Sequence, residues 1–175
     1  AHPRAVERVA GRLDPARTLV LVSSKSGTTL ETRCHADFFL DWARGGERFV
    51  AITDPGSELE RLAGERGFAA VFHGVPTIGG RYSALSPFGL VPAVLLGLAV
   101  ERLLERALET AEACRLPAEG NPGLELGLAL GEGWRAGRDK VCVPEAQGFG
   151  LWLEQLLAES TGKEGKGLVP APGES

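Results

Sequence analysis

Methionine is absent from this chain, tyrosine occurs once, and cysteine occurs only three times among 175 residues. The cysteines, Cys34, Cys114 and Cys142, are scattered and odd in number, and no two of them form a CxxC pair. This pattern gives no sign of a disulfide framework or a zinc site, and it favours a reducing compartment. Because an initiator methionine is lacking, we expect that the first residue was processed or that the sequence was cut from a longer chain.

Long apolar runs are also missing. The longest, residues 88–100, is interrupted by glycine and proline, and a helix that crosses a bilayer needs about 20 apolar residues. The N-terminus lacks the charged and then apolar pattern of a signal peptide. A net charge of −4 disfavours nonspecific nucleic-acid binding, which needs clustered positive charge. We therefore expect a cytoplasmic protein that binds neither membranes nor nucleic acid.

The common cofactor motifs are absent as well. The sequence has no Walker lysine motif, no GxGxxG and no cluster of histidines and cysteines. We therefore expect no metal, nucleotide or prosthetic group.

What the sequence does contain is an alternation of strand-like and helix-like segments. Its composition, 43% apolar and 24% charged, is that of a soluble globular protein of one domain. Strands are predicted over residues 18–23, 49–53, 69–72 and 140–143, and helices over 5–13, 29–44, 57–64, 86–114, 124–135 and 149–160. This alternation predicts an α/β fold with a parallel sheet of about four to five strands flanked by helices. We place the domain over residues 1–162 and a Gly/Pro-rich tail over 163–175.

A polar turn follows the first predicted strand. Residues 23–32 read SSKSGTTLET, and they come between the apolar run TLVLV and a helical pattern. A strand-to-helix turn presents free backbone N–H groups and the positive end of a helix dipole, both of which attract phosphate. Hydroxyl groups donate to phosphate oxygens, and Gly27 lets the backbone approach closely. The turn therefore favours a phosphate site over the alternative, an ordinary serine-rich turn with a helix cap.

Two further motifs carry candidate catalytic groups. The loop after the third strand contains GGRYS, in which two glycines let the backbone and the Arg81 guanidinium approach a ligand together. The last helix ends in AESTGK, where Glu159 lies near a helix C-terminus. The dipole disfavours a carboxylate there, and an unfavourable placement can mark a functional residue. Taken singly, each motif also has a simpler interpretation. Arg81 could be a solvated arginine in a surface loop, and Glu159 could be an ordinary solvated glutamate.

These three motifs, in this order, resemble those of the phosphoglucose isomerase family, whose core is the sugar isomerase (SIS) domain. The resemblance extends over nearly the whole chain. The segments FVAITDPGSELERLA and WLEQLLAESTGKEGKG look most like the isomerase domain of bacterial transaldolase–glucose-6-phosphate isomerase fusion proteins. The resemblance implies a flavodoxin-like, three-layer α/β/α fold. It also implies a first SIS domain without its first strand and turn, since only 17 residues precede the strand that starts at Thr18.

The resemblance implies a role for each motif. The residues implied to hold the substrate phosphate, in part through the backbone N–H of the lysine, are Ser24, Lys25, Ser26 and Thr29. Gly80 and Arg81 would lie against C1 and C2 of the sugar, where Arg81 would stabilise an enediolate. Glu159 would be the base that moves a proton between C2 and C1.

The implied reaction is aldose–ketose isomerisation of glucose 6-phosphate and fructose 6-phosphate, which needs a carboxylate base and a positive group near the developing oxyanion. Three possibilities stay open: the first SIS domain of a glucose-6-phosphate isomerase, a non-catalytic SIS module that binds a phosphosugar, and a phosphomannose-type or dual-specificity isomerase. The family's second SIS domain, with its ring-opening histidine and late lysine, has no counterpart here, so we expect the isolated chain to be weakly active or inactive. We also expect it to form a homo-oligomer or to dock onto the second domain, because a truncated sheet exposes strand edges and apolar faces.

Overall fold

A computed structural model of the chain describes residues 2–143 and 148–174. By their contacts, the residues group into two compact units, Ala1–Leu98 and Ala99–Ser175. The first unit contains the polar turn and the GGRYS loop, and the second contains the AESTGK segment. The expected single domain over residues 1–162 stays a prediction.

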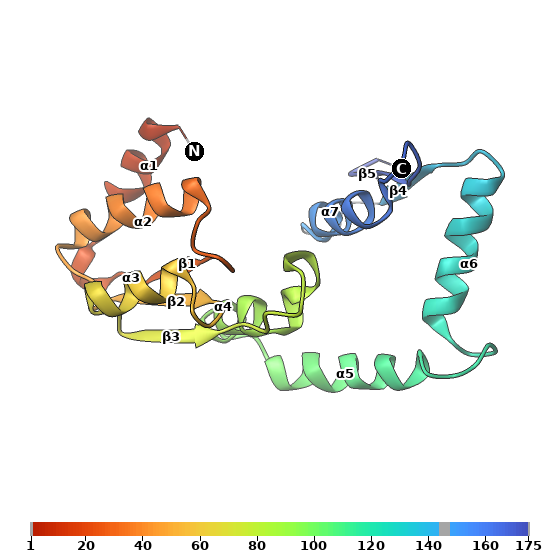
Figure 1. Ribbon diagram of the computed structural model, residues 1–175, viewed down its shortest axis with the longest axis horizontal. Helices are drawn as coiled ribbons and strands as arrows, with labels where there is room; N and C mark the ends of the chain where they lie inside the picture. Colours follow the sequence, from red (N-terminus) through yellow and green to blue (C-terminus); the bar gives the residue numbers. More distant parts are fainter. Residues whose placement is uncertain (1, 144–147, 175) are drawn as a thin grey trace. The chain divides into compact units, whose positions relative to one another are not determined.

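Three parallel strands form the sheet of the first unit. In sheet order they are β1 (Val20–Ser23), β2 (Phe49–Thr53) and β3 (Ala70–His73). The two helices that connect them, α2 (Leu30–Ala43) and α3 (Glu58–Arg66), lie on the same face of the sheet (Figure 1), as two crossovers of the same hand require. Since all three strands run in one direction, the turns that follow them meet at one edge of the sheet.

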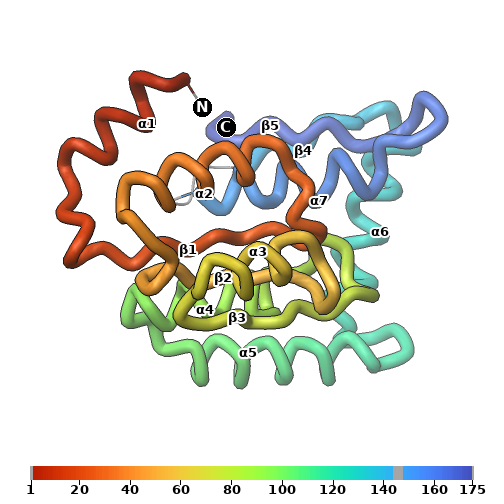
Figure 2. Tube along the Cα trace, turned by 60° about the vertical axis from the view of Figure 1, so that its left-hand side comes forward, coloured from red at the N-terminus to blue at the C-terminus, as the bar shows by residue number. Residues whose placement is uncertain are grey.

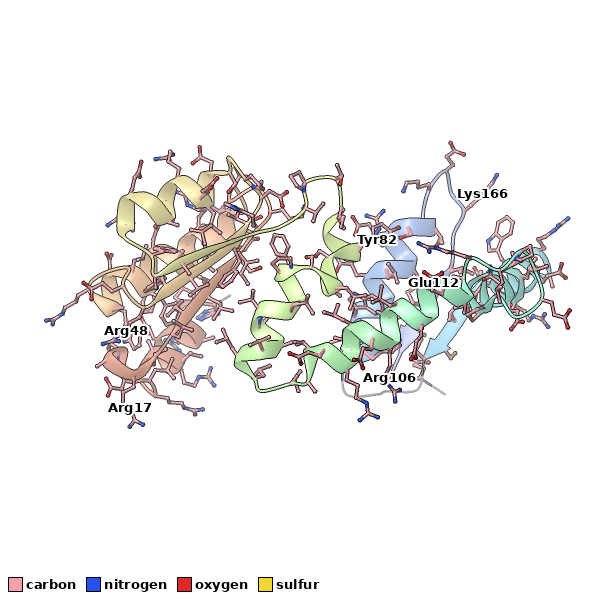
Figure 3. All side chains as sticks on the ribbon, turned by 90° about the horizontal axis from the view of Figure 1, so that it is seen from below. Arg17, Arg48, Tyr82, Arg106, Glu112 and Lys166 are labelled. Carbon is pink, nitrogen blue, oxygen red and sulfur yellow. The ribbon has the colours of Figure 1, made fainter. Side chains whose placement is uncertain are left out.

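The remaining elements of the first unit are α1 (Pro3–Ala10), the short 3₁₀ helices η1 (Pro15–Arg17) and η2 (Gly80–Leu85), and α4 (Pro87–Leu95). Of these, α4 packs against η2 and contacts β2. Figure 3 shows the side chains of Arg17 and Arg48, which precede β1 and β2. Both arginines therefore belong to the amino end of the sheet, away from the turns that follow the strands.

The core of the first unit lies between the sheet and its two crossover helices. Phe49 and Ala51 of β2 pack in one apolar cluster with Leu40 of α2 and Leu59 of α3. Val50 faces the other way, where it lines an apolar surface together with residues of α4. Because strand residues alternate between faces and both faces are covered, the whole of β2 is buried.

The second unit contains a two-stranded sheet. Its elements are the helices α5 (Val100–Ala113), α6 (Pro122–Arg135) and α7 (Phe149–Thr161) and the strands β4 (Lys140–Val143) and β5 (Val169–Pro172). The two strands pair in parallel, and α7, which comes between them in the chain, packs along β5 (Figure 2). This β4–α7–β5 arrangement is a further crossover unit, in addition to the two of the first unit.

The predicted α/β class is confirmed, since parallel strands alternate with helices in open sheets. The described residues contain five strands, but these form one three-stranded and one two-stranded sheet. The fifth strand, β5, lies in the segment that we expected to be a Gly/Pro-rich tail. Two of its four residues are prolines, which lack the N–H that a strand ladder needs, so the sequence did not predict it.

One helix prediction is wrong. The sequence predicts a single helix over residues 86–114 that Pro92 bends or restarts, whereas the structure has two helices, α4 and α5, which residues 96–99 separate. Pro92 lies inside α4. Gly97 instead adopts a φ of 74°, the left-handed conformation that ends helices, so the glycine and not the proline sets the break.

Candidate functional site

The polar turn lies between the carboxyl end of β1 and the start of α2, as the sequence predicts. Ser24 is buried, and its N–H donates to the carbonyl of Ile52, which extends the pairing of β1 with β2 by one residue. Lys25 is half-buried, whereas Ser26 and Thr29 are exposed. The four predicted phosphate ligands are thus together at the edge of the sheet where α/β folds bind their ligands.

Hydrogen bonds within the turn fix its conformation. The Ser24 hydroxyl accepts from the N–H of Gly27 at 3.1 Å and lies 3.4 Å from Oγ1 of Thr29. The Ser26 hydroxyl accepts from the N–H of Thr28 at 3.2 Å and lies 2.7 Å from Oγ1 of the same residue. These N–H and O–H groups are donors of the kind that a phosphate accepts from, so an arriving anion can replace the hydroxyls as the acceptor.

Gly27 allows the turn to pass close to α3. Its φ of 73° lies in the left-handed region, and the residue is buried. A Cβ atom at this position would lie 2.2 Å from the backbone nitrogen of Leu59, in the first turn of α3. The path of the turn therefore depends on a glycine for both its conformation and its space.

The start of α2 offers further donors. Thr29 is the N-cap residue, but its side chain accepts no hydrogen bond from the helix. The first N–H groups of any helix have no partner inside it, and the dipole makes this end positive. These N–H groups can therefore donate hydrogen bonds to an acceptor outside the helix, such as a phosphate.

The Lys25 side chain contacts three other segments of the first unit. Its Nζ donates to Oδ1 of Asp54 at 2.9 Å and to the carbonyl of Val75 at 3.1 Å. It also lies 5.3 Å from the centre of the Phe88 ring. Asp54 follows β2 and Val75 follows β3, so the ammonium group lies where the turns after all three strands converge.

Sequence reasoning missed the residues that hold Lys25. Thr53, the last residue of β2, is fully buried, and its hydroxyl donates to the carbonyl of Lys25 at 3.1 Å and lies 2.6 Å from Oγ of Ser57. The N–H of Asp54 donates to the same carbonyl at 3.1 Å. The signal that could have found Thr53 and Asp54 is their place at the end of a strand whose neighbour also ends in polar residues. The sequence holds no comparable signal for Phe88.

The arginine motif lies in η2, in the same unit. Gly80 begins this 3₁₀ helix, and Arg81 is half-buried with its guanidinium carbon 4.8 Å from the centre of the Tyr82 ring. η2 packs on α4, and Phe88 of α4 lies beneath the Lys25 ammonium. The polar turn and the GGRYS loop therefore both contact α4.

Glu159 lies on α7, in the second unit, two residues before the helix ends. The predicted position near a helix C-terminus is therefore confirmed. Its side chain is exposed, and Oε2 accepts from Nε2 of Gln155 at 3.5 Å. Its carbonyl accepts from Nζ of Lys163 at 3.4 Å. The role of Glu159 as a base stays a prediction.

A hydrogen bond joins α3 to the end of β3. Oε1 of Glu60 lies 2.7 Å from Nε2 of His73, and Oε2 accepts from the N–H of Gly56. The hydrogen bond from Gly56 and then the one from His73 hold the pKa of Glu60 below its usual value. Ser57 caps α3 by accepting from the N–H of Glu60 at 3.1 Å. In a capping box the Glu60 side chain would accept from the N–H of Ser57 in return, whereas here it accepts from the N–H of Gly56.

The three cysteines are exposed and free. Within residues 2–143 and 148–174, no three histidine, cysteine, aspartate or glutamate side chains come together as a metal ion would require. In the same described part of the chain, no helix combines the length and the apolar character needed to cross a membrane.

Comparisons with known proteins bear on the whole chain. A family model described as phosphoglucose isomerase matches residues 2–164. The glucose-6-phosphate isomerase of Synechococcus sp. strain JA-3-3Ab is 41% identical over 172 residues, which cover 91% of this chain and 32% of that protein. The probable glucose-6-phosphate isomerase of Haloarcula marismortui is 35% identical over 183 residues, which cover 97% of this chain and 41% of that protein.

Among solved structures, a hypothetical protein of Thermus thermophilus is similar with a TM-score of 0.90 and 32% sequence identity. The match covers 98% of this chain and 45% of that chain. The chain thus spans less than half of the solved structure, and it spans about a third of the Synechococcus enzyme, 32% of its length. Both units have counterparts in longer proteins.

Proposed function

Because this chain belongs to the phosphoglucose isomerase family, we propose that it forms part of an enzyme that interconverts glucose 6-phosphate and fructose 6-phosphate. Its matched relatives are much longer, so the activity is proposed for the whole protein. This chain would supply the phosphate-binding turn, the arginine and the glutamate.

The polar turn is the observation that supports this function most. Hydroxyl groups of Ser24, Ser26 and Thr29 lie beside backbone N–H groups and the start of α2. Such a set of neutral donors suits a phosphate that takes no part in the reaction. Binding energy from a group remote from the reacting carbons can position the substrate and lower the barrier.

The reaction itself requires a base and a group that stabilises negative charge. In the direction from aldose to ketose, we assign Glu159 to remove the proton from C2 and to return it to C1 after the enediolate has formed. A well-placed base contributes about 10²–10⁴-fold to the rate. We assign Arg81, beside Gly80, to the developing oxyanion, since a guanidinium is always charged and offers donors in a fixed geometry. The isomerisation moves one proton from C2 to C1 and one from O2 to O1 within the same molecule, so we include no cofactor.

We extend the proposal to the cellular context that the family implies. The protein would bind a phosphorylated sugar as its substrate. It would act in glycolysis and gluconeogenesis, in the cytoplasm. We also propose that the chain forms a homo-oligomer or docks onto a second SIS domain. We propose that it binds neither nucleic acid nor a membrane.

Calorimetry tests the phosphate site in the 175-residue chain. Fructose 6-phosphate should bind in the millimolar to micromolar range, and inorganic phosphate should compete with it, because both present the same anionic group to the turn. If folded protein gives no heat with either ligand, the site is not a phosphate site.

A glutamate variant tests the reaction. If the chain turns over fructose 6-phosphate in a coupled assay, Glu159→Gln should abolish turnover and leave binding unchanged, because the amide keeps the shape but cannot take the proton. Glu154→Gln, on the same helix and also exposed, is the matched control. Unchanged turnover in Glu159→Gln would show that Glu159 is not the base. If the chain is a binding module, it and the variant will both be inactive and bind alike.

A further inference from the structure

We propose that the Lys25 ammonium is a positioning group and not a phosphate ligand: paired with Asp54, it ties together the turns after β1, β2 and β3 and so sets the spacing of the phosphate-binding groups. This inference rests on the proposed phosphate site, in which it gives the Lys25 side chain a positioning role. Lys25 then serves that site through its backbone, while its side chain holds the surrounding loops.

The contacts of the ammonium group carry this assignment. It donates to a carboxylate oxygen of Asp54 at 2.9 Å and to the Val75 carbonyl at 3.1 Å. The side chains of the ion pair are only 26% and 18% exposed, so water screens the pair less than it screens one on the open surface. The positive charge is thus compensated by a neighbouring carboxylate inside the protein.

The backbone of Lys25 is held by the same segment. Its carbonyl accepts from the buried hydroxyl of Thr53 and from the N–H of Asp54, each at 3.1 Å. One residue further along, the carbonyl of Ser26 accepts from the N–H of Glu58, the first residue of α3, at 3.2 Å. The turn is therefore fastened to the segment after β2 by main-chain bonds on one side and by the ion pair on the other.

The Asp54 carboxylate argues against direct binding of phosphate by the ammonium. A phosphate that touched Nζ of Lys25 would also approach a carboxylate 2.9 Å from that nitrogen. Repulsion by the carboxylate would offset much of the attraction by the ammonium, because both act over nearly the same distance. The neutral hydroxyls and N–H groups of Ser24, Ser26 and Gly27 carry no such penalty.

The two assignments predict opposite signs for one substitution. If the ammonium binds phosphate, Asp54→Asn removes a competing carboxylate and tightens phosphate binding. If the ammonium positions the turns, Asp54→Asn loosens them and weakens binding, in the same direction as Lys25→Met.

The experiment measures binding of inorganic phosphate and of fructose 6-phosphate to the full chain by calorimetry in chloride buffer. We expect Lys25→Met and Asp54→Asn each to weaken binding by about three- to tenfold, the effect that coupled neighbours ordinarily have. The double variant should bind no more weakly than the weaker single variant. Arg48→Met, which removes a positive charge at the amino end of β2, is the matched control and should change binding little. An Asp54→Asn variant that binds phosphate as tightly as the unaltered chain, or more tightly, overturns the inference.

Amide hydrogen exchange supplies a measurement that needs no ligand. The N–H groups of Asp54 and Glu58, which donate to the carbonyls of Lys25 and Ser26, should exchange faster in Lys25→Met and in Asp54→Asn but not in Arg48→Met. Unchanged exchange in both variants overturns the inference. If the unaltered chain binds no phosphate, the proposed function fails, and exchange alone still decides whether Lys25 holds the turns.

Discussion

Two glycines of the first unit adopt almost the same backbone conformation in different surroundings. Gly27 has a φ of 73° and Gly56 a φ of 74°. A Cβ atom at Gly27 would lie 2.2 Å from the Leu59 nitrogen, whereas one at Gly56 would meet nothing within 4 Å. The pair therefore separates the cost of a left-handed backbone from the cost of a collision.

We expect Gly56→Ala to lower the free energy of unfolding by about 1–2 kcal/mol, the cost of a left-handed conformation in an L-residue. Gly27→Ala should cost about 1–3 kcal/mol more, because the added methyl forces the backbone of α3 to move. Urea denaturation followed by circular dichroism measures both. Equal losses in the two variants would contradict the collision at Leu59.

Acid should weaken the contribution of Glu60 to stability. Its pKa is lowered from an unperturbed 4.5 in the folded chain, first by the hydrogen bond from Gly56 and then by that from His73. A carboxylate with a lowered pKa stabilises the folded state above its unfolded pKa, and this contribution is lost as pH falls through the folded value. Glu60→Gln should therefore lower the unfolding midpoint at about pH 6, and the difference from the unaltered chain should shrink below about pH 4.5.

The measurement is thermal unfolding of the full chain at a series of pH values from about 6 to about 3. Glu65→Gln removes the same charge from the same helix and serves as the control. If Glu60→Gln lowers the midpoint equally at every pH, the carboxylate bonds to Gly56 and His73 do not contribute as described.

Among the elements, the corner between α5 and α6 depends on one buried side chain. Oδ1 of Asn121 accepts from the N–H of Leu124 at 2.9 Å and so caps α6. Its Nδ2 donates to the carbonyls of Cys114 at 2.9 Å and Leu116 at 2.7 Å, just after the end of α5. The amide thus combines a helix cap with a link between two helices.

Two variants separate these roles. Asn121→Asp keeps an oxygen that can cap α6 but loses both donations to the segment that follows α5. Asn121→Ala loses the cap as well, which ordinarily costs about 0.5–2 kcal/mol. We therefore expect both variants to lower the free energy of unfolding of the second unit, and the alanine variant more, as measured by urea denaturation. An aspartate variant as stable as the unaltered chain would show that the link contributes nothing.

Elements with local signals could be predicted from the sequence, and those set by distant contacts could not. The apolar runs at residues 49–53 and 140–143 are strands with the predicted bounds. By contrast, the helix break at Gly97 lies inside a continuing apolar pattern. The prolines of β5 conceal a strand that is stabilised by pairing with β4, a segment distant in the sequence. The polar turn was likewise found from its residues, but the partner of Lys25 is 29 residues away and depends on the packing of the sheet.

At the scale of the whole molecule, the candidate residues are divided between the two units. The first unit contains the entire polar turn, its contacts with Asp54, Val75 and Phe88, and Arg81. The second contains Glu159. If the assigned roles hold, phosphate binding and proton transfer depend on different parts of the chain.

Residues 1–98 expressed alone should therefore fold cooperatively, bind inorganic phosphate about as tightly as the full chain does, and show no turnover, because Glu159 belongs to the other unit. The expectation follows because the hydrogen bonds described above for the turn have both partners in this unit. Circular dichroism first shows whether the fragment is folded, and calorimetry then measures phosphate binding. Ser24→Ala in the same fragment removes the acceptor for the N–H of Gly27 and should weaken binding. A folded fragment that has lost phosphate binding would mean that groups beyond Leu98 complete the site, and the turn could then no longer be regarded as sufficient for holding the anion.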